Sequence, residues 1–65
     1  MIVEDICNGR GGNVVIIGDN EKEVRERAEI ERKEIDFMRS PFFDGVVKMT
    51  PNGQYMANVK YYGLD

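Results

Sequence analysis

Residues 20–40, NEKEVRERAEIERKEIDFMRS, carry dense charge of both signs and lie between two segments of strand-like composition. At 100° per residue, Val24, Ala28, Ile35 and Met38 fall in one narrow apolar stripe, and Glu31 lies within it. A lone helix in a small domain needs one apolar face to pack on a sheet. The stretch therefore predicts one amphipathic helix that packs on a sheet formed by the rest of the chain.

Both ends of this helix carry local signals. Asp19 or Asn20 is suited to cap the first turn, because its side chain accepts a hydrogen bond from an exposed amide there. Pro41 disfavours helical geometry at Ser40, so we expect the helix to end at about Arg39.

A second, smaller apolar strip on the same stretch is formed by Ile30 and Phe37, well to one side of the first. Packing on the sheet needs only one helix face. We therefore expect the second strip to remain available to a partner.

Four other segments have the composition of β-strands. Residues 13–18, NVVIIG, are a compact β-branched run, and residues 54–62 alternate clearly between two faces. The glycine-rich residues 8–12 and the Asn52-Gly53 pair are turn sequences that join strands into hairpins. The predicted strands are residues 2–8, 13–18, about 45–50 and about 54–62.

The order ββαββ predicts one small α+β domain over residues 1–65, with a four-stranded antiparallel sheet and one helix packed on one face. The order of the strands in the sheet is left open. The helix stripe is expected to share its core with Val14, Ile16, Val47, Met49 and one face of the last strand, either Tyr55, Ala57 and Val59 or the opposite alternation.

A chain of 65 residues buries only a small core, about 3–5 kcal/mol net, and usually needs a further stabilising element. Cys7 is the only cysteine, which excludes an internal disulfide, and the absence of histidine argues against a zinc site. Cys7 itself is expected to be a small buried side chain. The remaining stabilising elements are binding to a larger partner and self-association, expected as a dimer because of leftover apolar surface at Ile30, Phe37, Phe42 and Phe43.

Charge and residue types also exclude several classes of function. A net charge of −3 is too acidic for a typical nucleic-acid binder, and residues 1–9 form neither a signal peptide nor a membrane span. We expect a cytoplasmic protein that is a complete small gene product. Without a Ser-His or Cys-His pair, we expect no enzymatic activity, no cofactor and no metal.

Two polar features each have competing interpretations. The loop over residues 8–12 resembles a phosphate cradle, but it leads into a strand instead of a helix, which favours a simple turn with Arg10 exposed. Glu31 either extends past the sheet edge, pairs with Arg27 or Lys60, or meets a partner.

The main indication of function is the surface that the predicted fold leaves uncovered. One helix covers one face of the sheet, so the other face is exposed or bound by a partner. Tyrosine, methionine and arginine are enriched at interface cores and hot spots. We expect a non-enzymatic protein that binds a larger protein or ribonucleoprotein complex through Arg10, Ile30, Phe37, Met56, Lys60 and Tyr62.

The alternative is an oligomer that sequesters a small nucleotide between its subunits. Arg10, Lys48 or Lys60 would hold the phosphate, and a tyrosine of the last strand would stack on the base. With few cations on the sheet, an open nucleic-acid channel is not expected.

The run of elements resembles that of several small phage-encoded proteins, including some type I anti-CRISPR proteins. The likeness is carried by residues 21–36 (EKEVRERAEIERKEID), 44–49 (DGVVKM) and 52–62 (NGQYMANVKYY), and it is one of element pattern. It implies a viral protein in the host cytoplasm that inhibits a host defence or regulatory complex by occupying a surface. The chain is more acidic than a lysine-rich inhibitor that works near nucleic acid, so that behaviour is not carried over.

Overall fold

Four strands and one α-helix follow one another in the order ββαββ, as expected, so the α+β fold is confirmed. The computed structural model describes residues 1–63. Its elements are β1 (Ile2–Asn8), β2 (Gly11–Gly18), α1 (Glu21–Glu34), the 3₁₀ turn η1 (Phe37–Arg39), β3 (Lys48–Met49) and β4 (Tyr55–Tyr62).

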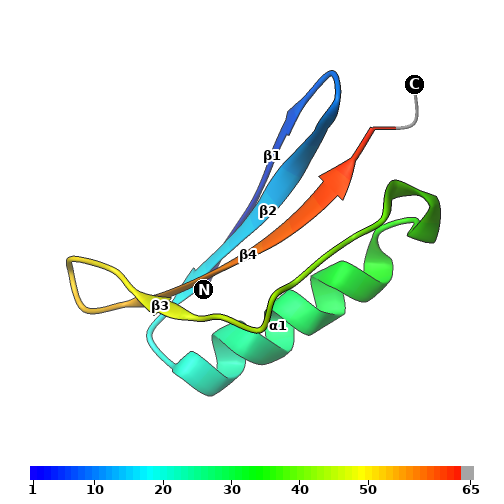
Figure 1. Ribbon diagram of the computed structural model, residues 1–65. Helices are drawn as coiled ribbons and strands as arrows, with labels where there is room; N and C mark the ends of the chain where they lie inside the picture. Colours follow the sequence, from blue (N-terminus) through cyan, green and yellow to red (C-terminus); the bar gives the residue numbers. More distant parts are fainter. Residues whose placement is uncertain (64–65) are drawn as a thin grey trace.

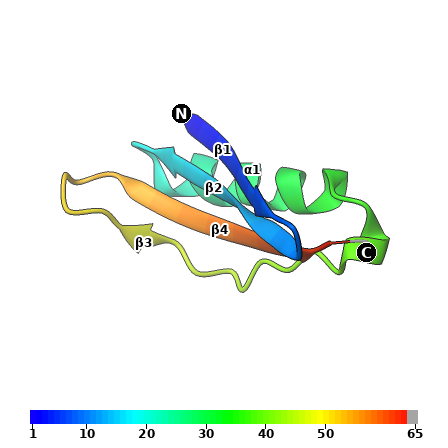
Figure 2. The ribbon, with the colours of Figure 1, turned by 90° about the horizontal axis from the view of Figure 1, so that it is seen from above.

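The sheet is antiparallel throughout and has the order β1-β2-β4-β3. β2 lies between β1 and β4; it pairs with β1 from Gly11 to Ile17 and with β4 from Gly11 to Gly18. The chain leaves β2, runs through α1, and returns alongside the outer edge of β4 before it turns into β4 itself (Figures 1 and 2). The three long strands β1, β2 and β4 therefore form the main part of the sheet.

The helix begins as the sequence indicates. Asn20 is the N-cap, and its side chain accepts a hydrogen bond from the amide of Glu23 at 3.1 Å. Val24 and Ala28 are buried against β2 and β4, and α1 lies on one side of the sheet only (Figure 1). The apolar stripe thus has the predicted role over the first two turns.

The predicted end of the helix at Arg39 is wrong, because α1 ends at Glu34. Ile35 takes an extended conformation and packs on the edge of the core. Asp36 then accepts a hydrogen bond from the amide of Met38 at 3.0 Å and caps the separate turn η1. A short side chain that bonds to nearby main chain competes with helix continuation, so the chain leaves the helix before it reaches Pro41.

The core lies between α1 and the two central strands. Its buried side chains come from alternate positions of β2 and β4 and from one face of α1: Val14, Ile16, Val24, Ala28, Ala57, Val59 and Tyr61. Ile35, Phe43, Val47 and Tyr55 are partly buried around it. The Tyr55, Ala57 and Val59 alternation of the last strand is therefore the one that faces the helix.

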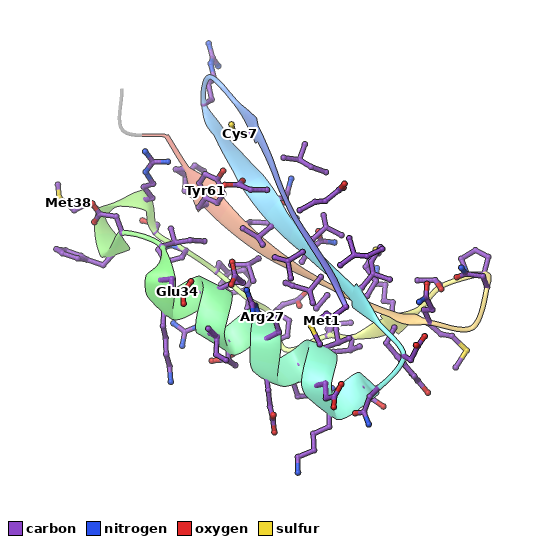
Figure 3. All side chains as sticks on the ribbon, turned by 180° about the vertical axis from the view of Figure 1, so that it is seen from behind. Met1, Cys7, Arg27, Glu34, Met38 and Tyr61 are labelled. Atoms are coloured by element: carbon purple, nitrogen blue, oxygen red, sulfur yellow. The ribbon has the colours of Figure 1, made fainter. Side chains whose placement is uncertain are left out.

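Three residues expected in the core lie outside it. Met38 is 67% exposed on η1, at the outer end of the molecule (Figure 3), because the helix has already ended. Met49 is 66% exposed because β3 lies at the sheet edge, away from α1. Cys7 is also exposed, since α1 packs on β2 and β4 and leaves β1 uncovered.

The third strand is shorter than the predicted 45–50. Only Lys48 and Met49 pair with β4, opposite Met56 and Tyr55. Further back, Phe42 forms an isolated bridge with Lys60. Residues 43–47 lie between these two pairings and follow the edge of β4 without joining it as a strand.

Glu31 is explained by an interaction within the helix. Its side chain is mostly buried, and its carboxylate accepts a hydrogen bond from Arg27 Nε at 3.0 Å. Of the alternatives left open, the Arg27 pair is the one observed. The other ion pairs of the described residues, Arg25 with Glu21 and Arg32 with Glu29, also lie on α1.

Tyr61 closes the core at the end of the sheet near the first hairpin. Its hydroxyl donates a hydrogen bond to the carboxylate of Asp5 on β1 at 2.5 Å, and the Arg39 guanidinium lies 5.8 Å from its ring centroid. Figure 3 shows Tyr61 on β4, at the end of the sheet that is near Cys7 and away from Met1. The hydrogen bond to Asp5, helped by burial and by the negative charge of Asp5, raises the pKa of Tyr61 to about 12.

This contact predicts a loss of stability at alkaline pH. The pKa of Tyr61 is higher in the folded state than its usual value of about 10. The stabilisation of the fold by the contact between Tyr61 and Asp5 is therefore complete below pH 10 and is lost as the pH rises through about 12. We expect a phenolate absorbance step near pH 12 that is missing in Tyr61→Phe and retained in Tyr62→Phe. A full phenolate titration before pH 11 in the wild type would contradict the Asp5 contact.

Candidate functional site

The sheet face opposite α1, here called the open face, is uncovered along its whole length. The strand register places alternate residues of each strand on it, opposite in direction to Val14 and Ile16, which face the helix. β1 contributes Ile2, Glu4 and Ile6, β2 contributes Asn13, Val15 and Ile17, and β3 and β4 contribute Lys48, Met56, Asn58, Lys60 and Tyr62.

Exposed apolar side chains lie at both edges of this face, half-buried Val15, Ile17 and Met56 lie between them, and the lysines lie toward β3 and β4. Ile6 is 57% exposed and Phe42, which pairs with Lys60 on the same side, is 60% exposed. Small soluble domains rarely leave several large apolar side chains on one continuous face without a use. The open face is therefore the first candidate for a binding surface.

A small cavity of about 140 Å³ lies on the open face, between the outer edge of β4 and the returning segment. It occurs where residues 43–47 are separated from β4, between the Phe42–Lys60 bridge and the Lys48–Met56 pair. Its lining residues are Phe42, Asp44, Val46, Lys48, Met56, Asn58 and Lys60.

A second, shallower depression lies beside the turn between β1 and β2. It brings Arg10 together with Lys60 and Tyr62, although Arg10 is fifty residues away from Lys60 in the sequence. The turn is fixed to the end of β4 because the amide of Gly63 donates a hydrogen bond to the Arg10 carbonyl oxygen at 2.9 Å. The turn itself joins two strands, as its glycines predicted.

The six residues predicted to form one binding surface fall on two sides of the molecule. Met56, Lys60 and Tyr62 lie on the open face, and Arg10 lies at its end. Ile30 and Phe37 are exposed on α1 and η1, in the layer on the other side of the sheet. One flat partner surface cannot contact both groups, so they represent two separate candidate patches.

Several residues of the open face were not singled out by sequence reasoning. Ile2 and Ile6 alternate with the acidic Glu4 in β1, and this period of two was a usable signal for a half-exposed strand. Val46 carried no such signal, because its position depends on how the chain separates from β4. Phe42 was expected to be exposed and is, whereas Phe43, expected with it, packs against the core. The cavity itself could not be read from the sequence.

Beyond these patches, the described residues form neither a metal-binding cluster nor a membrane-spanning helix. No group of three or more His, Cys, Asp or Glu side chains lies close enough to hold a metal ion among residues 1–63. In the same part of the chain, no helix is long and apolar enough to cross a membrane. Cys7 is an exposed free thiol.

Comparison with protein-family models, with curated proteins and with solved structures gives no match for this chain. Its function is therefore argued from the geometry of the open face.

Proposed function

We propose that the chain is a non-enzymatic binding protein that occupies a surface of a larger protein assembly through the open face of its sheet. The observation that carries this proposal is the row of exposed apolar side chains on a face that no part of residues 1–63 covers. The element pattern shared with phage-encoded inhibitors supports the same mode of action, which is occlusion of a host defence or regulatory complex.

The dimensions of the molecule fit this role. A standard protein interface buries about 800 Å² of solvent-accessible surface on each partner. The molecule measures 38 × 19 × 17 Å. Its broad side is thus about as large as one half of such an interface. A smaller contact, limited to the cavity or to the Arg10 depression, would not use the exposed Ile2 and Ile6 of β1.

The charges on the open face define the partner further. Lys48 and Lys60 flank the β4 side and Arg10 lies at the end of the same face, while Glu4 on β1 and Asp44 at the cavity are acidic. The seven acidic residues between 21 and 36 lie on the helix side. A partner surface with an apolar centre and acidic residues at its rim would complement this arrangement.

The alternative function, sequestration of a nucleotide between subunits, is supported by the two lysines at the cavity. Tyr55 and Tyr61, however, face the core, and Tyr61 is buried. Tyr62 is the tyrosine of β4 exposed on the open face. Stacking on a base would therefore use Tyr62 or Phe42.

A glutamate placed among the exposed apolar side chains of β1 tests the docking surface. In Ile6→Glu, an unpaired carboxylate would be buried at the interface, and we expect capture of a stoichiometric partner from host lysate to fall at least about thirtyfold. Ile30→Glu carries the same charge change on the helix side and should capture the partner normally. Both positions are exposed, so both variants should fold.

Two outcomes would contradict the proposal. The first is equal loss of capture in Ile6→Glu and Ile30→Glu, and the second is a nucleotide that co-elutes with the pure protein in place of a host protein. Light scattering on the same samples tests self-association. A wild-type dimer that Ile6→Glu converts to a 7.5 kDa monomer would assign the open face to a second copy of the chain.

A further inference from the structure

The two edges of the sheet differ in how they are protected from a further strand. At one edge, β3 has only two residues and carries Lys48, and short length and lysine are common means of protection. At the other edge, β1 has seven residues, pairs with β2 residue by residue without a bulge, and contains neither proline nor lysine. Figure 2 shows β1 and β3 at opposite edges, with β2 and β4 between them. β1 is therefore the long, regular edge of this sheet.

The main-chain groups of β1 that face outward follow from the register. Phe42 and Lys60 exchange two hydrogen bonds, of 2.8 and 2.9 Å, so Lys60 directs its N–H and carbonyl oxygen away from β2. Main-chain groups alternate in direction along a strand, so the odd-numbered residues of β4 bond to β2. The pairs of β2 with β4 and with β1 carry this alternation across the sheet. It follows that Val3, Asp5 and Cys7 direct their main-chain groups to the free edge.

The side chains of β1 give this edge its specificity. Water bonds to the main chain of the free protein at any open sheet edge, so the outward groups alone do not indicate a ligand. Glu4 and Asp5 are consecutive, so their carboxylates lie on opposite faces at the middle of the strand. Ile2 and Ile6 flank Glu4 on the open face and are 55% and 57% exposed. The strand thus presents an acidic centre between two exposed apolar side chains.

No basic side chain of residues 1–63 forms an ion pair with this acidic centre. The ion pairs in that part of the chain lie on α1, and the carboxylate of Asp5 accepts its hydrogen bond from a neutral hydroxyl, that of Tyr61. Lys60 lies two strands away, about 10 Å across the sheet. Opposite charges that face each other on adjacent strands are stabilising. A strand added to β1 is therefore favoured if it carries basic residues opposite Glu4 and Asp5.

We infer that the outer edge of β1 binds an extended segment of the partner protein as an antiparallel fifth strand, with two adjacent basic residues opposite Glu4 and Asp5. Its main chain pairs with the three outward-facing residues of β1, which gives affinity, and its side chains give specificity. Apolar residues opposite Ile2 and Ile6 extend the open face by one strand. The acidic rim proposed for the partner faces the lysines near the opposite edge, so the two requirements concern different parts of its surface. The inference rests on the proposed function, because it specifies how the partner contacts β1.

A seven-residue peptide tests this edge on the purified protein. When acetyl-TVRRTVT-amide pairs antiparallel with β1, its two arginines lie opposite Asp5 and Glu4. Its two valines then lie opposite Ile6 and Ile2. We expect amide NMR titration to give an affinity at least about tenfold higher than for acetyl-TVEETVT-amide, in which like charges would face each other.

Two readouts distinguish strand addition from simple charge attraction. On binding, the outward amides of Val3, Asp5 and Cys7 should exchange with solvent more slowly, whereas the amides of α1 should be unaffected. Methylation of the two peptide amides that face β1, those of the first arginine and the second threonine, should weaken binding at least about tenfold, because it removes two hydrogen-bond donors. Methylation of the second arginine and the second valine, whose amides point away from β1, should leave binding nearly unchanged.

Matched charge variants identify the acidic centre. Glu4→Lys should weaken binding of the arginine peptide at least about fivefold. Glu26→Lys makes the same charge change on the exposed surface of α1 and should leave binding unchanged. Equal affinity for the two peptides, equal effects of the two methylations, or equal effects of the two variants would each overturn the inference. So would protection of Val3, Asp5 and Cys7 that rises with protein concentration without peptide, because a second copy would then occupy the edge.

Failure of this inference can be told apart from failure of the proposed function. The peptide measurements need only the purified chain, and the capture experiment needs host lysate. If the arginine peptide does not bind, but the wild type captures a host protein that Ile6→Glu loses, the partner uses the open face alone and the inference is wrong. If the peptide binds as expected and no host protein is captured, the proposed function is wrong, although the edge still selects a basic strand.

Discussion

Ile16→Ala is expected to unfold most of the protein at room temperature. Ile16 is 0% exposed at the centre of β2 and lies among the largest fully buried side chains of the core. Loss of a buried isoleucine side chain costs about 2–5 kcal/mol, because the cavity left behind adds to the lost transfer energy. The net free energy of unfolding of a domain of this size is about 3–5 kcal/mol, so little stability would remain.

Urea unfolding followed by circular dichroism measures this effect. Ile30→Ala is the matched control, because it removes the same atoms from an exposed position on α1, and surface changes of this kind alter stability by about 0.5 kcal/mol or less. If the two variants had the same unfolding midpoint, the assignment of the core to the β2 and β4 face would be wrong.

Gly11→Ala should lower the free energy of unfolding by at least about 3 kcal/mol. The loss would come from overlap with main-chain atoms and not from a change in the core. Gly11 has a φ of 143°, where side chains are rarely accommodated, and a Cβ atom there would overlap the Tyr61 carbonyl oxygen and lie 2.9 Å from the Tyr62 Cα. Both neighbours are main-chain atoms of β4, so β2 and β4 would have to separate at this end.

Gly53→Ala provides the comparison for this glycine. Gly53 also has a positive φ, of 83°, but a Cβ atom there would meet nothing within 4 Å. Gly53→Ala should lower the free energy of unfolding by only about 1–2 kcal/mol, the usual penalty for a left-handed residue. Thermal unfolding that ranks Gly53→Ala as the more harmful change would contradict the close approach of β2 and β4 at Gly11.

Local sequence signals predicted the parts of this fold that depend on local chemistry. The alternation of β4 separated its two faces without deciding which one is buried, the β-branched run of β2 supplied Val14 and Ile16, and Asn20 was one of the two expected caps. These features depend on residues two to four positions apart. They were therefore accessible without knowledge of the tertiary structure.

The errors concern features set by distant parts of the chain. A helix of 14 residues is about 21 Å long, too short to cover a molecule 38 Å long, and it packs on only two strands, which leaves Cys7 exposed. Met49 was placed in the core because residues 45–50 looked like a continuous strand. In the structure, Met49 pairs with β4 but lies at the sheet edge, away from α1. Only residues 43–47 are held away from β4, by Gly45 and by Arg25 of another element.

The candidate site was only partly accessible for the same reason. Met56, Lys60 and Tyr62 were identified by the period of β4, and Arg10 by its glycine-rich turn. The separation of these residues from Ile30 and Phe37 required knowledge of the side of the sheet on which α1 packs.

The position of β1 at the sheet edge also limits how copies of this chain can assemble. Its outer edge is free among the described residues, and an unpaired edge is a template for strand addition. Two-fold pairing of β1 with β1 that uses most of the strand centres on Glu4 or on Asp5, and it would place a carboxylate directly opposite its own copy. Like charges opposite each other in a sheet are destabilising. The acidic pair at the middle of β1 therefore acts as a guard against growth into a continuous intermolecular sheet.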